Sequence, residues 1–292
     1  MPFLELKKLK LKTVLQTYKK RIDQFISDEF SESETENKLK EASLHALEGA
    51  GKRFRPSITL IVAELLQSPS EVLYPALAIE LFHTASLIAD DLPCMDNDPI
   101  RRDKPSLHFA FGEDVALLTS YALIGEGYQC IFKNKEALKG KLVNLDERTF
   151  IALSMLAKSN SFQGAPSGQY LDLFPGDLTK EKLDLILYRK TVLFFETAFA
   201  FGWLFGGGDL SKLPIVKNAS YNFGMAFQIY DDFCDLKQDR EKEKKVSYPI
   251  YLGEEQGRVY LEEHLKNCKK SLQELGLYKS HFKELLEFLA VC

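Results

Sequence analysis

Apolar residues recur three and four positions apart along most of this chain, the spacing that places them in one stripe on an α-helix. Residues 74–91 illustrate the pattern, since their stripe holds Leu77, Ile79, Leu81, Phe82, Leu87 and Ile88. Further stripes lie at residues 115–132, 150–156, 183–203, 220–236 and 259–275. Alternating runs joined by a two-residue turn, the pattern of a β-hairpin, are not found. The spacing therefore predicts an all-α protein.

Short segments rich in Pro, Gly and Ser separate the stripes, at residues 68–70, 104–106, 164–166, 174–176 and 206–208. No repeat of fixed period and no shift in composition divides the 292 residues. Residues 237–245 are strongly polar and are expected to form an exposed loop or helix end. We therefore expect residues 1–292 to form a single domain, a large bundle of about ten or more helices.

Composition argues against several classes of protein. The 38 Lys and Arg and the 42 Asp and Glu residues leave a net charge of −4, which argues against a nucleic-acid-binding protein. The five cysteines are odd in number and form no CxxC pair, so a reducing, cytoplasmic location is expected rather than a disulfide framework. The longest charge-free apolar stretch, residues 197–208, is shorter than the ~18 residues of a membrane span, so no stable membrane insertion is expected.

Two clusters of carboxylates follow apolar stripes, where unpaired negative charge is costly. They consist of Asp90, Asp91, Asp96 and Asp98 in the first and of Asp231, Asp232 and Asp235 in the second. Adjacent carboxylates repel one another and need a cation or a basic partner. Neither cluster has a regular His or Cys companion, which argues against zinc, whereas oxygen ligands suit Mg²⁺. The clusters therefore predict a magnesium site.

Helical spacing places each cluster on one face of its helix. Gln228 shares a face with the second cluster, because the spacing is i, i+3, i+4 and i+7. His83 and Ser86 have the same relation to Asp90. One acidic triplet alone would be read as solvated surface, but two clusters that both follow apolar stripes favour a functional site.

Basic residues form a complementary set. They are Lys52, Arg53 and Arg55 around one phenylalanine, the pair Arg101 and Arg102, and Arg189 and Lys190 followed by Thr191. Any one of these groups alone would be explained equally well as part of a solvated helix face. Together with two metal-type clusters they suggest a diphosphate site, since guanidinium and ammonium groups bind phosphate oxygens directly. The apolar helices between the clusters would hold an apolar substrate tail.

Five motifs resemble those of the trans-isoprenyl diphosphate synthases, in the family's order, over residues 41–253. DDLPCMDNDPIRRDKPSLHFAFGEDVALL resembles the first aspartate-rich region, FQIYDDFCDL resembles the second, and GKRFRP, SGQYLDL and RKT match further motifs. The resemblance implies an all-α helical bundle of the isoprenoid synthase type around a central apolar cavity. It implies a Mg²⁺-dependent prenyltransferase that condenses isopentenyl diphosphate with an allylic diphosphate, and a homodimer. The DDLPxMD form is typical of bacterial farnesyl and plant-type geranylgeranyl synthases.

The resemblance also implies roles for individual residues. About three Mg²⁺ ions would lie between the clusters, held by Asp90, Asp96 and Asp231 and supported by Asp91, Asp232 and Asp235. The residues expected to bind isopentenyl diphosphate are Lys52, Arg55, His83 and Arg102. Those expected to contact the allylic diphosphate are Arg101, Lys190 and Lys245, with Thr191 and Gln228 lining the path of the carbocation.

The chain also departs from the family pattern. Where relatives have a GKxxGKD loop, this chain has KQDREKEKK, so the loop lysine has no certain counterpart among Lys237, Lys242 and Lys244. Two alternatives therefore stay open: a non-catalytic subunit of a heteromeric synthase and a class I terpene cyclase. The second Asp cluster counts against the cyclase, and the presence of both clusters counts against the non-catalytic subunit.

The two residues expected to control product length, Ala85 and Ser86, are both small. They stand five and four positions before Asp90, where by resemblance an aromatic ring would stop chain growth. An open floor predicts geranylgeranyl diphosphate as the main product. Phe82 and Tyr121 are candidates for a deeper floor, which keeps farnesyl diphosphate as the alternative.

Overall fold

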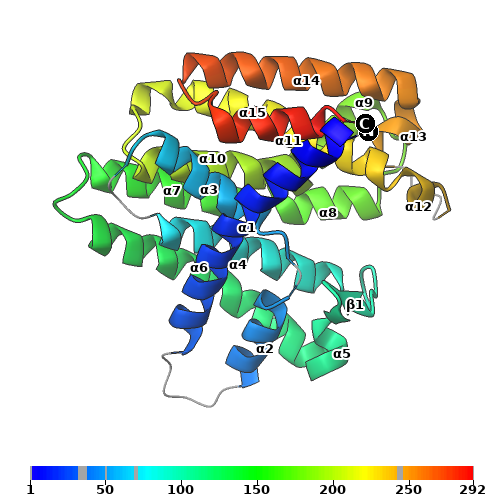
Figure 1. The fold of residues 1–292 in the computed structure, drawn as a ribbon. Helices are drawn as coiled ribbons and strands as arrows, with labels where there is room; N and C mark the ends of the chain where they lie inside the picture. The colour runs from blue at the N-terminus through cyan, green and yellow to red at the C-terminus, as the bar shows by residue number, and fades with distance from the viewer. Residues whose placement is uncertain (1, 32–37, 50, 69–71, 242–245, 292) are drawn as a thin grey trace.

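The computed structural model describes residues 2–31, 38–49, 51–68, 72–241 and 246–291, and nearly all of them lie in helices (Figure 1). The first half of the described chain contains α1 (Pro2–Ser31), α2 (Lys38–Leu47), α3 (Phe54–Leu65), α4 (Leu73–Asp90), β1 (Ile100–Arg101), β2 (Lys104–Pro105), α5 (Leu107–Phe111), α6 (Glu113–Leu138) and α7 (Leu145–Ser159). The second half contains α8 (Ala165–Leu173), α9 (Lys180–Leu187), η1 (Tyr188–Val192), α10 (Leu193–Phe205), η2 (Leu210–Lys212), α11 (Leu213–Cys234), α12 (Leu236–Glu241), α13 (Tyr248–Leu252), α14 (Glu254–Glu274) and α15 (Ser280–Leu289). The predicted all-α fold is confirmed.

The helix at the centre of the bundle is α10, whose residues are all buried. It packs against α3, α4, α7 and α11, as an apolar-all-round helix must. Gly202 lets α3 approach closely, because a methyl group there would lie 2.4 Å from the carbonyl oxygen of Thr59. Thr59 in turn donates from its hydroxyl to the carbonyl oxygen of Ala198 (3.0 Å). These contacts tie α3 to α10 and so hold the GKRFRP motif, where α3 begins, beside the core.

A two-stranded hairpin follows α4 and corrects the expectation that the chain has none. Its strands pair Ile100 with Pro105 and Arg101 with Lys104 in antiparallel register. The turn residues Arg102 and Asp103 both have positive φ, 55° and 64°, as a type I′ turn requires. Two-residue strands are too short to produce an alternating pattern, and Asn-Gly or Asp-Gly, the usual sign of this turn, is absent. The hairpin therefore could not be predicted from the sequence.

One helix of the described chain, α6, is long and apolar enough to cross a membrane. In its most apolar window 39% of the residues are buried inside the structure, and core helices of soluble proteins pass the same test. It packs against α2, α4, α5 and α7. Its exposed positions include Leu117, Leu118, Tyr121 and Phe132. The absence of membrane insertion stays a prediction.

Candidate active site

The first acidic cluster lies where α4 ends. Asp90 is the last residue of α4, at the end of the helix whose dipole disfavours negative charge. The chain then turns tightly, because Met95 N donates to Leu92 O (2.8 Å) and Asp96 N donates to Asp90 O (2.9 Å). This turn returns Asp96 to the neighbourhood of Asp90. The two residues of the first cluster that are predicted to ligate metal are therefore joined through their backbones.

Asp90 is poised to receive a cation. Burial, opposed by the ammonium of Lys190 and reinforced by the charges of Asp96 and Asp91, raises the pKa of Asp90 to about 6. A carboxylate whose ionised form is disfavoured by burial gains most from a metal ion at that place. The electrostatics of this corner therefore fit the predicted magnesium site.

Asp91 is engaged by Arg101 of β1 and is buried. Arg101 Nε donates to both Asp91 oxygens (2.9 and 3.1 Å), its Nη2 also donates to Asp91, and Nη2 reaches Asp98 Oδ2 at 2.9 Å. Burial raises the pKa of Asp91, and the guanidinium opposes that rise. Asp91 therefore holds the hairpin arginine, which agrees with a supporting part rather than with direct metal binding.

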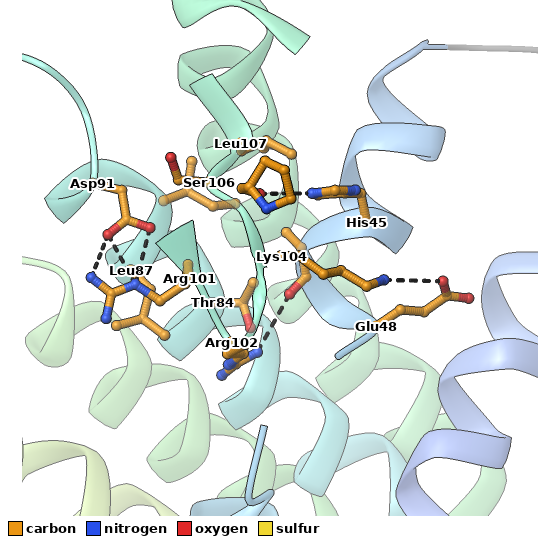
Figure 2. Close-up of a pocket in the computed structure, with 13 residues that line it drawn as sticks. His45, Glu48, Thr84, Leu87, Asp91, Arg101, Arg102, Lys104, Ser106 and Leu107 are labelled. Atoms are coloured by element: carbon orange, nitrogen blue, oxygen red, sulfur yellow. Dashed lines mark hydrogen bonds and ion pairs between the residues drawn. The ribbon is translucent and has the colours of Figure 1, made fainter. Parts of the chain in front are cut away.

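Figure 2 shows the small pocket, about 30 Å³, that lies behind this pair. On its far side the hairpin is tied to α2, since a ring nitrogen of His45 is 2.9 Å from the carbonyl oxygen of Pro105 and Lys104 lies 3.9 Å from Glu48. Arg102 donates to the carbonyl oxygen of Ala46 (3.4 Å). These contacts hold the hairpin in place and so set the positions of both arginines.

The second cluster lies at the end of α11 and divides into two parts. Asp232 is buried, and both of its carboxylate oxygens accept hydrogen bonds, from Gln228 Nε2 (2.9 Å) and from Tyr248 N (2.9 Å). Asp231 is only partly buried, and Asp235, at the C-cap of α11, is exposed. Asp232 therefore ties α11 to α13, while Asp231 and Asp235 remain on the accessible side.

Lys190 and Thr191 lie in η1, a π-helical turn between α9 and α10. The apolar stripe at residues 183–203 predicts one helix. The chain is helical without a break from α9 through η1 to α10, but its hydrogen bonding changes from α-helical to π-helical at the RKT motif. Such turns insert one residue and often occur at functional sites. Lys190 Nζ donates to Asp172 Oδ2 of α8 (2.5 Å), so the ammonium is held at the mouth of the site.

A cleft of about 60 Å³ runs along the turn, lined by Lys190, Thr191, Gln228, Asp172 and Val246, among others. Thr191 and Gln228, both expected to line the path of the cation, therefore share one cleft with Lys190. The amide nitrogen of Gln228 donates to Asp232, which leaves its carbonyl oxygen as the acceptor it can offer.

The predicted isopentenyl diphosphate site is a cationic group centred on Arg55. Arg55 Nη1 lies 3.3 Å from His83 Nε2, and its guanidinium stacks 4.9 Å from the ring centre of Phe195. Burial, with the charges of Arg55 and Arg102 beside it, holds the pKa of His83 well below its usual range, so the ring is neutral and accepts from Arg55. Arg55 Nε is buried and has no hydrogen-bond partner. A buried guanidinium with a free donor suits an anionic ligand.

Two acidic residues that bind an arginine of this site, Glu80 and Asp23, were not predicted. Glu80, buried in the apolar stripe of α4, accepts from Arg53 Nη1 (2.5 Å) and from Arg102 Nη2 (3.2 Å). Arg53 Nε also donates to Asp23 Oδ1 of α1 (2.8 Å). The signal available was a charged residue within an otherwise apolar stripe, three positions before His83. Glu80 joins α3, α4 and the hairpin at the basic pocket.

A cavity of about 420 Å³ extends inward from the first cluster, between α4, α6 and α8. Asp90 and Lys190 lie on its wall, together with Ala85, Ser86 and Phe82. The remaining lining is largely apolar and includes Ala89, Met95, Ile124, Ala165, Pro166, Leu173 and Phe174. The predicted apolar cavity, with the two chain-length residues on its wall, is therefore present.

Not every predicted site residue can be placed in the site. Lys52 is exposed, and Lys245, with Lys242 and Lys244, lies outside the described residues. Lys237 is exposed on α12. Within the part of the chain that the structure describes, no three His, Cys, Asp or Glu side chains are gathered closely enough to hold a metal ion alone. That arrangement is compatible with Mg²⁺, which binds through one or two carboxylates plus substrate phosphates.

Comparison with known proteins identifies the family. The model of the polyprenyl synthetase family matches residues 36–249. The chain belongs to this family. This polyprenyl synthetase is 33% identical over 265 residues to "Geranylgeranyl pyrophosphate synthase 7, chloroplastic" of Arabidopsis thaliana, which covers 85% of the chain and 74% of the relative. It is 34% identical over 257 residues to a chloroplastic geranylgeranyl pyrophosphate synthase of Catharanthus roseus, covering 83% and 70%.

Solved structures of the polyprenyl synthetase family share its fold. A geranyltransferase of Legionella pneumophila superimposes with a TM-score of 0.82 at 26% identity, covering 98% of both chains. An FPP/GFPP synthase of Zymomonas mobilis superimposes with a TM-score of 0.81 at 26% identity, covering 96% of this chain and 98% of that one. The resemblance read from the five motifs and the helical-bundle fold are both confirmed, whereas the roles of the individual residues stay predictions.

Proposed function

We propose that this polyprenyl synthetase is a trans-prenyltransferase that condenses isopentenyl diphosphate with an allylic diphosphate. The observation that carries the proposal is the cavity of about 420 Å³ that has Asp90 and Lys190 on its wall and an otherwise largely apolar lining. One end would take the diphosphate and the other the prenyl tail. The homologous geranylgeranyl synthases and the structurally similar geranyltransferase support this reading.

The allylic diphosphate would lie between the two acidic clusters. Mg²⁺ held by Asp90 and Asp96 on one side and Asp231 on the other would neutralise the diphosphate as it leaves. Lys190 binds the same group directly, and Asp172 fixes its ammonium. The oxygens of Thr191 and Gln228, which line one cleft with Lys190, would stabilise the allylic carbon as it becomes positive after the C–O bond breaks.

Isopentenyl diphosphate would bind in the basic pocket without metal. Arg55 has a free buried donor, and Arg102 and Lys52 would add positive charge at the entrance. His83 is neutral, so it orients Arg55 rather than contributing charge. The double bond of isopentenyl diphosphate then attacks the allylic cation, and the proton lost from it passes to the departing diphosphate.

Geranylgeranyl diphosphate is the proposed product, because Ala85 and Ser86 leave the upper cavity open. Phe82, one helical turn before Ser86 on α4, also lines the cavity. The test is to incubate the purified enzyme with Mg²⁺, excess isopentenyl diphosphate and, in turn, dimethylallyl, geranyl and farnesyl diphosphates. Chain-length analysis should show C20. Product that stops at C15 would make the chain a farnesyl diphosphate synthase, and no transfer with any primer would contradict the enzymatic proposal.

A subunit of a heteromeric synthase is the second candidate. Two heterodimeric geranylgeranyl pyrophosphate synthase large subunits of Arabidopsis thaliana are among the relatives, one of them 33% identical over 251 residues. The altered loop after α11 also supports it. Under this reading the chain alone would bind isopentenyl diphosphate yet turn over poorly, and a partner chain would restore the rate. A terpene cyclase is disfavoured, because the basic pocket around Arg55 has no use in cyclisation.

We also propose a cytoplasmic homodimer. The apolar residues that α6 leaves exposed, Leu117, Leu118, Tyr121 and Phe132, support a self-complementary contact of the kind that two-fold dimers use. The location rests on the scattered cysteines and would be checked by cell fractionation. Light scattering of the purified chain should give twice the 33.3 kDa chain mass, and Leu118→Glu should shift it toward the monomer.

A further inference from the structure

Phe82 is among the residues that line the large cavity. Phe82 lies on α4 eight positions before Asp90, which is about 12 Å along the helix axis. Between them, Ala85 and Ser86 present little bulk to the cavity. A prenyl chain that grows from Asp90 along α4 would therefore pass Ala85 and Ser86 before it reaches the Phe82 ring.

Gly127 of α6 provides the space in which that ring lies. A methyl group at Gly127 would be 2.6 Å from Cε2 and 2.8 Å from Cδ2 of Phe82, closer than atoms can approach. The backbone of Gly127 has an ordinary helical conformation, so an alanine there would be strained only by the ring. Glycine inside a helix is otherwise unfavourable, which gives this one a packing reason.

The surrounding contacts leave the ring little freedom to avoid such a methyl group except toward the cavity. The ring of Tyr128 packs edge-on against Phe82, with 5.2 Å between the centres. The two helices cannot easily separate, since Ser120 of α6 donates to the carbonyl oxygen of Ala85 (3.0 Å) and α4 and α6 pack along much of their length. Phe82 itself is fully buried, so solvent is not open to it.

We propose that Gly127 is a specificity-determining residue for product length, which acts by letting the Phe82 ring withdraw from the cavity. This inference rests on the proposed prenyltransferase function. The depth of the cavity is then set by a pair of residues on two helices, and side-chain bulk on α6 shortens the product as effectively as bulk on α4.

The test compares the products of Gly127→Ala with those of wild type under excess isopentenyl diphosphate and a common primer. We expect the ratio of the wild-type product to the product one isoprene unit shorter to fall about tenfold, the smaller end of what one methylene does in an apolar pocket. Gly125→Ala is the matched control, because Gly125 lies on the same helix, is exposed, and would place its methyl group in open space. It should leave the ratio unchanged.

A second substitution separates this effect from general damage to the fold. Removing the ring in Gly127→Ala/Phe82→Leu should restore the wild-type length, and Phe82→Leu alone should keep or lengthen it. If Gly127→Ala gives the wild-type distribution, or if the double variant stays short, the proposal is wrong. If Gly127→Ala does not fold, Phe82→Leu decides: any shortening of its product overturns the proposal. Wild type that transfers no prenyl unit would instead overturn the proposed function.

Discussion

Gly168 of α8 lies directly against the backbone of Lys190, so closely that a methyl group at Gly168 would be 2.6 Å from the Lys190 nitrogen. Two side-chain bonds flank this contact. Arg189 Nη1 donates to Ser167 Oγ (2.7 Å), and Lys190 Nζ donates to Asp172. The SGQYLDL motif on α8 thus packs against the π-turn that carries the RKT motif. Contacts between the two motifs fix the position of Lys190.

Gly168→Ala should therefore displace the π-turn. A displacement near 1 Å is enough to cost about 100-fold in kcat/KM, because Lys190 must meet the diphosphate at hydrogen-bond distance. Steady-state kinetics with both substrates would measure the effect, which should be larger for the allylic substrate. Gly125→Ala, with its methyl group in open space, is the control. Wild-type kinetics for Gly168→Ala would contradict this account of the motif.

The helical placement of several candidate site residues could be predicted from the sequence, because it follows the 3.6-residue periodicity of the helix. The stripe at residues 74–91 corresponds to α4 to within one residue at either end, and its spacing placed His83 on the Asp90 face. The π-turn could not be predicted from the sequence, since no local pattern marks it, and in the structure it packs closely against Gly168 of α8. The pairing of Glu80 with Arg53 could not be predicted either, because it is a tertiary contact between residues of separate segments.

Glu80→Gln should lower the free energy of unfolding without changing the fold. Both Glu80 and Arg53 are almost fully buried, with side-chain exposures of 2%, and removing the Glu80 charge leaves the buried Arg53 guanidinium paired only with the more exposed carboxylate of Asp23 among the ion pairs of the described residues. Breaking such a pair costs about 3 kcal/mol, which chemical denaturation would record as a lower midpoint with an unchanged slope. The KM for isopentenyl diphosphate should also rise, since Arg102 loses an acceptor.

Glu262→Gln, on the exposed side of α14, is the matched control and should be nearly neutral. Equal midpoints for Glu80→Gln and Glu262→Gln would show that the buried pair contributes nothing to stability. A lower midpoint with an unchanged KM would separate the two parts of the prediction, and it would mean that Arg102 keeps its place without Glu80.

Arg55→Ala and Lys190→Ala should affect different substrates. Arg55 lies in the basic pocket beside His83, whereas Lys190 lies on the wall of the cavity near Asp90. Loss of one charge-assisted diphosphate contact corresponds to about tenfold to 100-fold in KM. Arg55→Ala should raise the KM for isopentenyl diphosphate, and Lys190→Ala that for the allylic primer. Equal effects of both variants on both substrates would show that the two pockets are assigned wrongly.

Asp90→Asn should stabilise the metal-free protein at neutral pH while removing its activity. The pKa of Asp90 is raised from 3.8 to about 6, first of all by burial, so its ionised form opposes folding. The free-energy cost of ionising Asp90 in the folded protein is therefore absent below about pH 4, grows as the pH rises to 6 and is complete above pH 6. In EDTA at pH 7.5 the variant should be about 1–2 kcal/mol more stable than wild type, and this difference should vanish near pH 4. Asp177→Asn, at an exposed carboxyl, is the matched control for the stability measurement. With Mg²⁺ and both substrates, Asp90→Asn should lose several orders of magnitude in rate, because a preorganised charge is removed from the leaving group.

In wild type, the Mg²⁺ concentration for half-maximal rate should rise as the pH falls below 6, since the proton and the metal compete for one carboxylate. A variant that is less stable than wild type in EDTA at pH 7.5 would mean that the buried Asp90 carboxylate does not oppose folding. A variant that keeps its rate would mean that Asp90 is not needed for the metal.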